Sequence, residues 1–291
     1  MLLYPPEKEM FGMLINSDWH IHTEYSYDAS NPLENIAESS IAQGLCCIGI
    51  TDHLNFNDEK FTEYVRRSSE AVRVAQKKYS NIILGVELTP IELPEFEYIA
   101  TCGKRDGYKP PSQSSPYGLE LGMTRSQLIS LGIRYAIGAA HWRLDVPFAK
   151  TLQPDLNACI KEWYRQQMWL ACDERVTILG HPWYHGNGIW YDDFSVIPRS
   201  MNADIAAAVK ENKKYVECNS HFFVSPKTSE KFRHRYAEFL RELFEMNIPI
   251  TYGSDSHHNY GDSRAAVEHY LRSVGFVEGD ISEISENDFW S

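Results

Sequence analysis

Histidines and carboxylates recur in short clusters along this 291-residue chain. The first cluster reads Asp-Trp-His-Ile-His and places His20 and His22 two residues apart. Because side chains alternate along an extended chain, we expect both imidazoles to point to one side and bind one cation, with Asp18 on that side too. The candidate ligands of all clusters are His20, His22, His53, Glu87, His141, His181, Asp255 and His257. Imidazole with carboxylate, and without thiolate, is typical of a hydrolytic site for Zn, Mn or Fe.

Each cluster ends a short apolar run that we interpret as a buried strand. The seven predicted strands span residues 13–18, 46–52, 82–87, 133–140, 176–181, 215–219 and 248–254. Amphipathic segments predict helices at residues 32–43, 58–79, 154–173, 201–214, 226–246 and 263–274. This alternation predicts an α/β fold, a TIM-like distorted (β/α)7 barrel, with a doubly wound open sheet as the alternative. The C-terminal strand ends of such a barrel meet on one face, so the clusters would form one metal site there.

The length of the chain is compatible with one barrel domain or with two smaller domains. A polar, proline-rich stretch lies within residues 92–130, between the third and fourth predicted strands. We interpret this stretch as an insertion or lid and not as a linker between domains. Residues 1–291 are therefore expected to form a single domain.

The charge balance restricts the partners of the protein. The chain has 28 Lys and Arg against 40 Asp and Glu, a formal net charge of −12. Long nucleic acids and anionic membrane surfaces bind mainly through cationic side chains, so neither is expected as a partner. A small phosphorylated substrate stays compatible, because bound cations outweigh distant surface charge. The N-terminus shows no signal peptide, and a cytoplasmic location is expected; the sequence predicts no oligomeric state.

Seven motifs, in this order, resemble those of the PHP (polymerase and histidinol phosphatase) superfamily over most of the chain. They are DxHxHT at 18–23, TDH at 51–53, GVE at 85–87, a histidine at 141, GHP at 180–182, ExN at 217–219 and GSDSH at 253–257. The resemblance implies two to three divalent ions (Zn, Mn or Fe) and shares the ligands among them. The first ion would be held by His20, His22, Glu87 and Asp255, and the second by Glu87 as a bridge with His141 and His181. The third would be held by Asp28, His53 and His257.

Asp28 is the least typical of these ligands. Many members of the superfamily have a histidine at this place, and here the segment reads HTEYSYDAS. A turn residue is the alternative interpretation of Asp28. Four further polar residues fit a supporting role, in which they accept the distal N–H of ligand imidazoles or tune the basicity of these ligands. They are Asp18, Asp52, Glu217 and Asn219.

Contacts with the substrate are expected from residues around these strand ends. Arg143, two residues after His141, is the candidate for binding phosphate oxygens, with a surface salt bridge as the alternative. Asp255 or a water molecule is the candidate proton donor to the leaving group. A rim of further candidates, with ordinary loop packing as the alternative, consists of Trp183, Tyr184, His185, Arg199 and Arg264.

The ligand set and the resemblance together predict a metal-dependent phosphoesterase. Its expected substrate is a small phosphate monoester similar to histidinol phosphate, attacked by a hydroxide that bridges two cations. Alternatives within the hydrolases are a nucleotide or oligonucleotide phosphoesterase and a protein-tyrosine phosphatase. A non-enzymatic metal-binding barrel is a further alternative, which the nearly complete ligand set disfavours.

Overall fold

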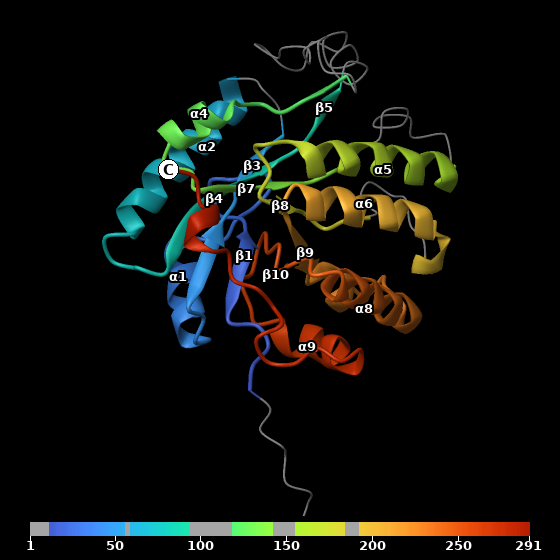
Figure 1. Ribbon diagram of the computed structural model, residues 1–291. Coiled ribbons are helices and arrows are strands. Elements are labelled where there is room, and N and C mark those ends of the chain that lie inside the picture. Colours follow the sequence, from blue (N-terminus) through green and yellow to red (C-terminus); the bar gives the residue numbers. More distant parts are fainter. Residues whose placement is uncertain (1–11, 56–58, 93–117, 142–154, 184–191) are drawn as a thin grey trace, which may run out of the picture.

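Consecutive parallel strands form a nearly closed sheet at the centre of the protein (Figure 1). The computed structural model describes residues 12–55, 59–92, 118–141, 155–183 and 192–291. Each strand along the sheet pairs with its neighbours in the order β1, β2, β4, β7, β8, β9, β10. Their bounds are β1 (Ser17–Ile21), β2 (Cys47–Ile50), β4 (Ile82–Leu88), β7 (Tyr135–Gly138), β8 (Ile178–Leu179), β9 (Tyr215–Asn219) and β10 (Ile250–Gly253). The short β3 (His53–Leu54) also pairs with β4.

The first and last strands approach each other at their C-terminal ends. There the backbone N–H of Asp255 donates to the carbonyl of His20 at 2.7 Å, and Ile21 forms a parallel bridge with Ser256. These contacts bring the two edges of the sheet together. The prediction of a TIM-like distorted (β/α)7 barrel is therefore confirmed, and the open-sheet alternative is wrong.

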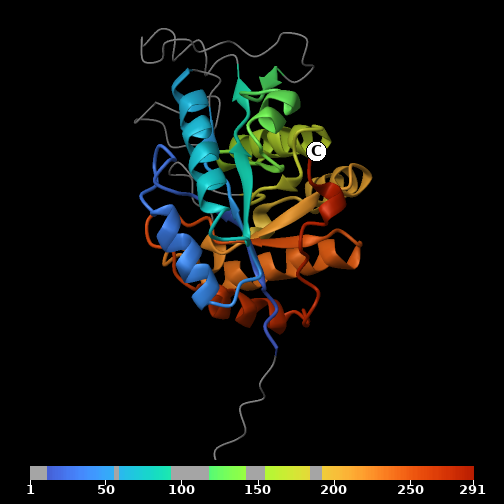
Figure 2. The same cartoon turned by 90° about the vertical axis from the view of Figure 1, so that its left-hand side faces the viewer.

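Helices cover the outside of the strands, as the two perpendicular views show (Figures 1 and 2). Their bounds are α1 (Leu33–Ala42), α2 (Glu59–Ala75), α4 (Arg125–Ser130), α5 (Leu156–Cys172), α6 (Arg199–Glu211), α7 (His221–Val224), α8 (Glu230–Glu245) and α9 (Arg264–Ser273). Two 3-10 turns, η1 (Phe194–Val196) and η2 (Glu286–Asp288), lie among them. Among the described residues, none of the helices has the length and apolarity that crossing a membrane requires.

The segment predicted as an insertion or lid is described only in part. Its first and last parts form a small antiparallel pair, β5 (Ile91–Glu92) with β6 (Leu119–Glu120), followed by α4. Residues 93–117 lie outside the described residues. The lid, like the single-domain organisation of residues 1–291, stays a prediction.

Apolar side chains form two cores, one inside the barrel and one between the strands and the helices. The inner core consists of buried side chains of four strands and of the C-terminal segment, which are Trp19, Tyr135, Ile137, Ile178, Tyr215 and Ile284. The C-terminal segment lies where the strands begin. Its Ser282 N–H donates to the carbonyl of Ile250 at 2.7 Å, and its Trp290 N–H donates to the carbonyl of Arg134 at 2.7 Å. Residues 281–290 thus close the end of the barrel opposite to the C-terminal strand ends.

The Tyr135 side chain occupies the space inside the barrel that a side chain at Gly49 of β2 would need. Its hydroxyl donates to the carbonyl of Trp19 at 2.6 Å. A Cβ atom on Gly49 would lie 1.8 Å from the Tyr135 hydroxyl oxygen. We therefore expect Gly49→Ala to lower the free energy of unfolding by about 1–3 kcal/mol, the usual cost of overpacking a core, as measured by urea denaturation.

The same substitution is expected to cost less when Tyr135 is first replaced by Phe, because the hydroxyl is then absent and the ring Cζ is 3.0 Å away. Gly261→Ala is the matched control, since a Cβ there meets its nearest atom at 3.9 Å. An equal cost of Gly49→Ala in both backgrounds would contradict this account of the packing.

Candidate metal centre

A bulge in β1 decides which way its side chains point. Ser17 and Asp18 pair with Cys47 and Ile48, but Ile21 pairs with Ile50, so two residues of β1 stand opposite one residue of β2. Such a bulge interrupts the alternation of side chains. Trp19 enters the inner core, and His20 contacts Glu217 of β9, which is separated from β1 only by β10. The strand also begins four residues later than predicted, which places His20 inside it.

Asp18 lies apart from the two imidazoles because of this bulge. Its carboxylate accepts from the backbone N–H of Ser254 at 2.9 Å and from the Tyr260 hydroxyl at 3.2 Å. The expectation that Asp18 shares a side with His20 and His22 is therefore corrected. Simple alternation places it there, but the extra residue of the bulge reverses its direction.

The predicted ligands of the first ion surround one point at the C-terminal strand ends. His20 Nε2 lies 3.0 Å from His22 Nε2 and 3.2 Å from Glu87 Oε2. Asp255 Oδ1 lies 3.5 Å from His20 Nε2 and 3.2 Å from His22 Nε2. Zn–N bonds of about 2.0–2.1 Å in a tetrahedron separate ligand atoms by about 3.3 Å. The spacing therefore fits one divalent cation.

Glu87 faces a second group of ligands with its other oxygen. Glu87 Oε1 lies 3.2 Å from His141 Nε2 and 3.0 Å from His181 Nε2. Glu87 is fully buried, and its Oε2 faces the first group and lies 2.8 Å from His53 Nδ1. A buried carboxylate is costly unless positive charge compensates for it. The arrangement therefore fits a carboxylate that bridges two cations.

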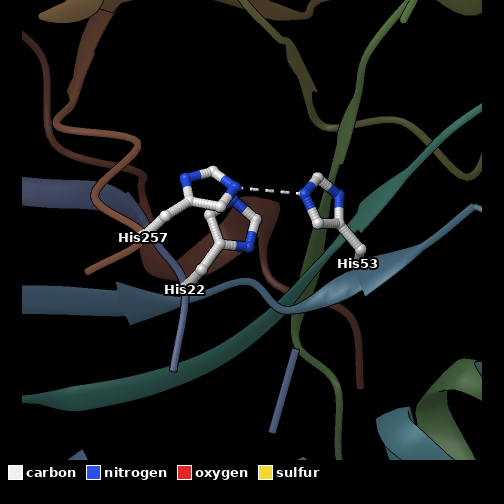
Figure 3. Close-up of side chains that lie close together, drawn as sticks. All are labelled: His22, His53 and His257. Carbon is white, nitrogen blue, oxygen red and sulfur yellow. Dashed lines mark hydrogen bonds between the residues drawn. The ribbon is translucent and has the colours of Figure 1, made fainter. Parts of the chain in front are cut away.

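The third group lies beside the first. His53 Nε2 and His257 Nε2 are 3.4 Å apart, and Figure 3 shows the two rings facing each other next to His22. Asp28 Oδ2 lies 3.4 Å from His53 Nε2 and 3.7 Å from His257 Nε2. Asp28 thus contacts both imidazoles with which the resemblance groups it. Among the described residues, three groups of neighbouring ligand atoms could hold metal ions, and His22 takes part in two of them: His20, His22 and Asp255; His22, His53 and His257; and Glu87, His141 and His181.

The charges of the centre depend on one another. Burial by itself raises the pKa of Glu87, but the imidazoles of His53, His20 and His141 outweigh burial and hold that pKa well below its usual range. Burial likewise lowers the pKa of His53, but Glu87 and Asp28 outweigh it and raise this pKa to about 10. The carboxylates and imidazoles thus favour each other's charged forms, and a cation would compete with the proton for the His53 ring nitrogen.

Two ligands occupy unusual backbone conformations at the strand ends. Asp255 has a φ of 53° and His181 a φ of 22°, in the left-handed region that residues other than glycine seldom adopt. The His181 N–H donates to Glu217 Oε2 at 2.5 Å, and the Asp255 N–H is bound by the carbonyl of His20. These hydrogen bonds hold the two ligands in place despite the strain.

Comparison with known proteins places this centre in a family. A model of the PHP domain matches residues 18–221, more than half of the chain. The chain belongs to the PHP domain family. A curated protein of Acetivibrio thermocellus named "Probable phosphatase" is 41% identical over 241 residues, which are 82% of this chain and 78% of that protein. The predicted class of a hydrolase of phosphoric esters is confirmed at this level, as a PHP-family phosphatase.

Two solved structures share the barrel of this PHP protein. One is histidinol phosphate phosphatase from Lactococcus lactis, complexed with Zn, L-histidinol and phosphate; its TM-score is 0.63 at 20% identity, over 90% of this chain and 95% of that chain. The other is a putative histidinol phosphatase from Listeria monocytogenes, with a TM-score of 0.57 at 14% identity, over 89% of this chain and 97% of that chain. These similarities show the common fold.

Glu217 and Asn219 support the ligands of the PHP centre. Glu217 Oε1 lies 2.6 Å from His20 Nδ1, and Asn219 Nδ2 donates to Asp255 Oδ2 at 3.1 Å. By contrast, Asp52 accepts from the backbone and hydroxyl of Thr23 and from the Ser68 hydroxyl. Asp52 and Asp18 were expected to accept from an imidazole N–H. Both instead accept hydrogen bonds that connect separate segments of the PHP domain.

Arg264 was expected at the substrate rim, and the structure corrects this expectation. Its guanidinium is buried and donates to the carbonyls of Ile15 at 3.2 Å and Gln43 at 2.8 Å. Ile15 precedes β1, and Gln43 ends α1. The guanidinium therefore lies where the strands begin, at the end of the barrel opposite to the ligands.

Two of the other rim candidates, Trp183 and Arg199, are among the described residues. Trp183 is buried in the core, and its backbone N–H donates to the Gln167 side chain. Arg199 is exposed and lines a groove of about 100 Å³ between α6 and α8, with Phe239 and Met246. Three candidates lie outside the described residues: Arg143, Tyr184 and His185.

The sequence reasoning missed three polar side chains next to the ligands of the PHP centre. Thr89 contacts His141, Asn55 contacts Thr89, and Tyr27 lies with its ring centroid 5.4 Å from that of His53. Thr89 lies two residues after Glu87, and side chains at this spacing in an extended chain point to the same side. This spacing could have identified Thr89 from the sequence. No local pattern indicated Asn55.

Glu217 offers a test of how the PHP domain supports its ligands. We expect Glu217→Gln to weaken Zn²⁺ binding about 10- to 100-fold, because an amide has one oxygen for the three donors that the Glu217 carboxylate accepts from, which are His20 Nδ1, the His181 N–H and Asn219 Nδ2. Competition titration with a zinc-binding dye measures the affinity. Glu211→Gln on the exposed side of α6 is the matched control. Unchanged affinity in Glu217→Gln would show that His20 needs no such support.

Proposed function

We propose that this PHP-family phosphatase hydrolyses a small phosphate monoester, with histidinol phosphate as the first candidate, and uses two to three divalent cations. The observation that carries the proposal is the position of Glu87. One of its oxygens faces His20 and His22, and the other faces His141 and His181. A carboxylate in this position suits two neighbouring cations, which is the arrangement of many phosphate-ester hydrolases.

The chain's own residues have distinct parts in this mechanism. When bound, divalent cations supply positive charge for the phosphate oxygens and activate a water molecule as the nucleophile. Glu217 fixes the ring of His20 through Nδ1, so that Nε2 faces the centre. The phosphate-binding role of Arg143 stays a prediction.

Asp255 lies among the ligands of the first group. Its Oδ1 faces His20 Nε2 and His22 Nε2, and its Oδ2 accepts from Asn219 Nδ2. Burial raises the pKa of Asp255, but the two imidazoles favour its ionised form and lower that pKa. We therefore infer that Asp255 acts as a ligand; its role as the proton donor to the leaving group stays a prediction.

The choice of substrate rests on charge and on likeness. A net charge of −12 disfavours long polyanions, whereas cations in the centre would attract a single phosphate group. The Lactococcus protein with the same fold holds L-histidinol and phosphate. A small phosphorylated molecule is therefore the proposed partner.

The test is a panel of phosphate esters with protein loaded separately with Zn²⁺, Mn²⁺ or Fe²⁺. The panel contains histidinol phosphate, a mononucleotide, a short oligonucleotide and a phosphotyrosine peptide. We expect the fastest phosphate release from histidinol phosphate and none after chelation or in His20→Ala. Metal-loaded protein that releases phosphate from no ester would overturn the proposal. Faster release from another ester would show that histidinol phosphate is the wrong substrate.

A further inference from the structure

A chain of hydrogen bonds starts at the second ligand group and ends beside the third. His141 Nδ1 lies 2.9 Å from the Thr89 hydroxyl oxygen. The Thr89 hydroxyl donates to Asn55 Oδ1 at 2.7 Å, and Asn55 Nδ2 donates to the Tyr27 hydroxyl oxygen at 3.2 Å. The chain therefore joins His141 of the second group to Tyr27, whose ring centroid lies 5.4 Å from that of His53 in the third group.

The Thr89 hydroxyl fixes the proton on the His141 ring. A hydroxyl has one proton, and Thr89 gives it to Asn55 Oδ1. Its oxygen is then an acceptor for His141, so that His141 Nδ1 carries the ring proton and Nε2 has the lone pair. Nε2 is the atom that lies 3.2 Å from Glu87 Oε1. A lone pair at that position is what a cation in the second group requires.

The Asn55 amide sets the direction of the whole chain. Its oxygen accepts from the Thr89 hydroxyl, and its nitrogen donates to the Tyr27 hydroxyl oxygen. If the amide were reversed, Thr89 would donate to His141 Nδ1 and a proton on Nε2 would occupy the cation's place. Asn55 and Thr89 are both buried, which isolates the chain from competing water.

We propose that Thr89 and Asn55 are positioning residues that hold His141 in the tautomer able to bind a cation, and that Tyr27 holds the Asn55 amide at the end of this chain. The proposal rests on the proposed function in one respect, that the ligand groups bind cations. It assigns no contact with substrate to Thr89 or Asn55. Their effect is on the affinity of the second group for its cation.

The first test measures Zn²⁺ binding to Thr89→Val and Thr89→Ser. Valine matches threonine in shape but cannot accept from His141, so we expect the affinity of one cation site to fall about 10- to 100-fold. Serine keeps the hydroxyl and should stay close to wild type. Equal affinity of the valine variant and wild type, with both folded by circular dichroism, would overturn the proposal. So would an equal loss in the serine variant.

The second test reads the tautomer directly in the metal-free protein. ¹⁵N NMR of labelled histidines distinguishes a proton on Nδ1 from one on Nε2, and the His141 signals are identified by their loss in His141→Gln. Because Glu87 Oε1 competes for a proton on Nε2, wild type is compared with Thr89→Ser, Thr89→Val and Thr89→Ala. We expect a larger share of His141 with its proton on Nδ1 in wild type and Thr89→Ser than in Thr89→Val or, if that variant does not fold, in Thr89→Ala. Equal shares in all of these proteins would overturn the proposal.

These outcomes are separate from the fate of the proposed function. A protein that binds Zn²⁺ but releases phosphate from no ester refutes the phosphatase proposal and leaves the tautomer result valid. A protein with full phosphatase activity and a wild-type response in Thr89→Val refutes the positioning role alone.

Discussion

Glu87→Gln is expected to release two cations and to lower kcat for phosphate release by about 1,000-fold or more, which corresponds to about 4 kcal/mol of lost transition-state stabilisation. Glu87 is fully buried, and each of its oxygens faces a different ligand group. Glutamine has nearly the same shape but no charge, and its NH₂ group would point toward one of the two cations. Elemental analysis of the purified protein measures the metal content, and a phosphate assay measures the rate.

The control for this substitution is Glu70→Gln, which removes an exposed carboxylate from α2. It should keep the metal content and the rate of wild type. If Glu87→Gln retains the full metal content, the interpretation of Glu87 as a bridge is wrong. Loss of a single cation would restrict Glu87 to one of the groups.

Removal of residues 282–291 is expected to lower the free energy of unfolding by about 5 kcal/mol, because it uncovers the inner core at the beginning of the strands. The segment buries Ile284 and Trp290, and Phe289 packs against Trp19 and Tyr135. Each large apolar side chain contributes about 1.5–3 kcal/mol when it is buried. Urea denaturation followed by fluorescence measures the loss.

A single substitution keeps this prediction testable if the truncated protein does not fold. Trp290→Ala should cost about 3 kcal/mol, within the usual range for large-to-small changes in a core. Val277→Ala, at an exposed position before the segment, should change stability little. A truncated protein with the stability of wild type would show that the segment does not close the barrel.

The sequence by itself determined the barrel fold and which residues form the metal centre. Each apolar run that predicted a strand ends near a candidate ligand, and parallel strands bring their C-terminal ends to one face. The pairing of His53 with Glu87 in adjacent strands shows how directly this rule acts. His20, His22, Glu87, His141, His181 and Asp255 therefore meet as expected, although they are far apart in the chain.

The tertiary structure alone decided how these ligands are supported. Alternation is a local rule, and one extra residue in β1 was enough to turn Asp18 away from His20. The buried position of Arg264 depends on carbonyls more than 200 residues earlier in the chain.

The same holds for the chain of hydrogen bonds and for the C-terminal segment. Thr89 meets Asn55 because β4 runs beside β3, and residues 281–290 reach the inner core because the strands leave that end of the barrel open. Hydrogen-bond partners and packing contacts are set by distances in space, which hydrophobic periodicity does not encode. The ligands follow from the order of the strands, whereas their orientation follows from contacts that form only when the barrel closes.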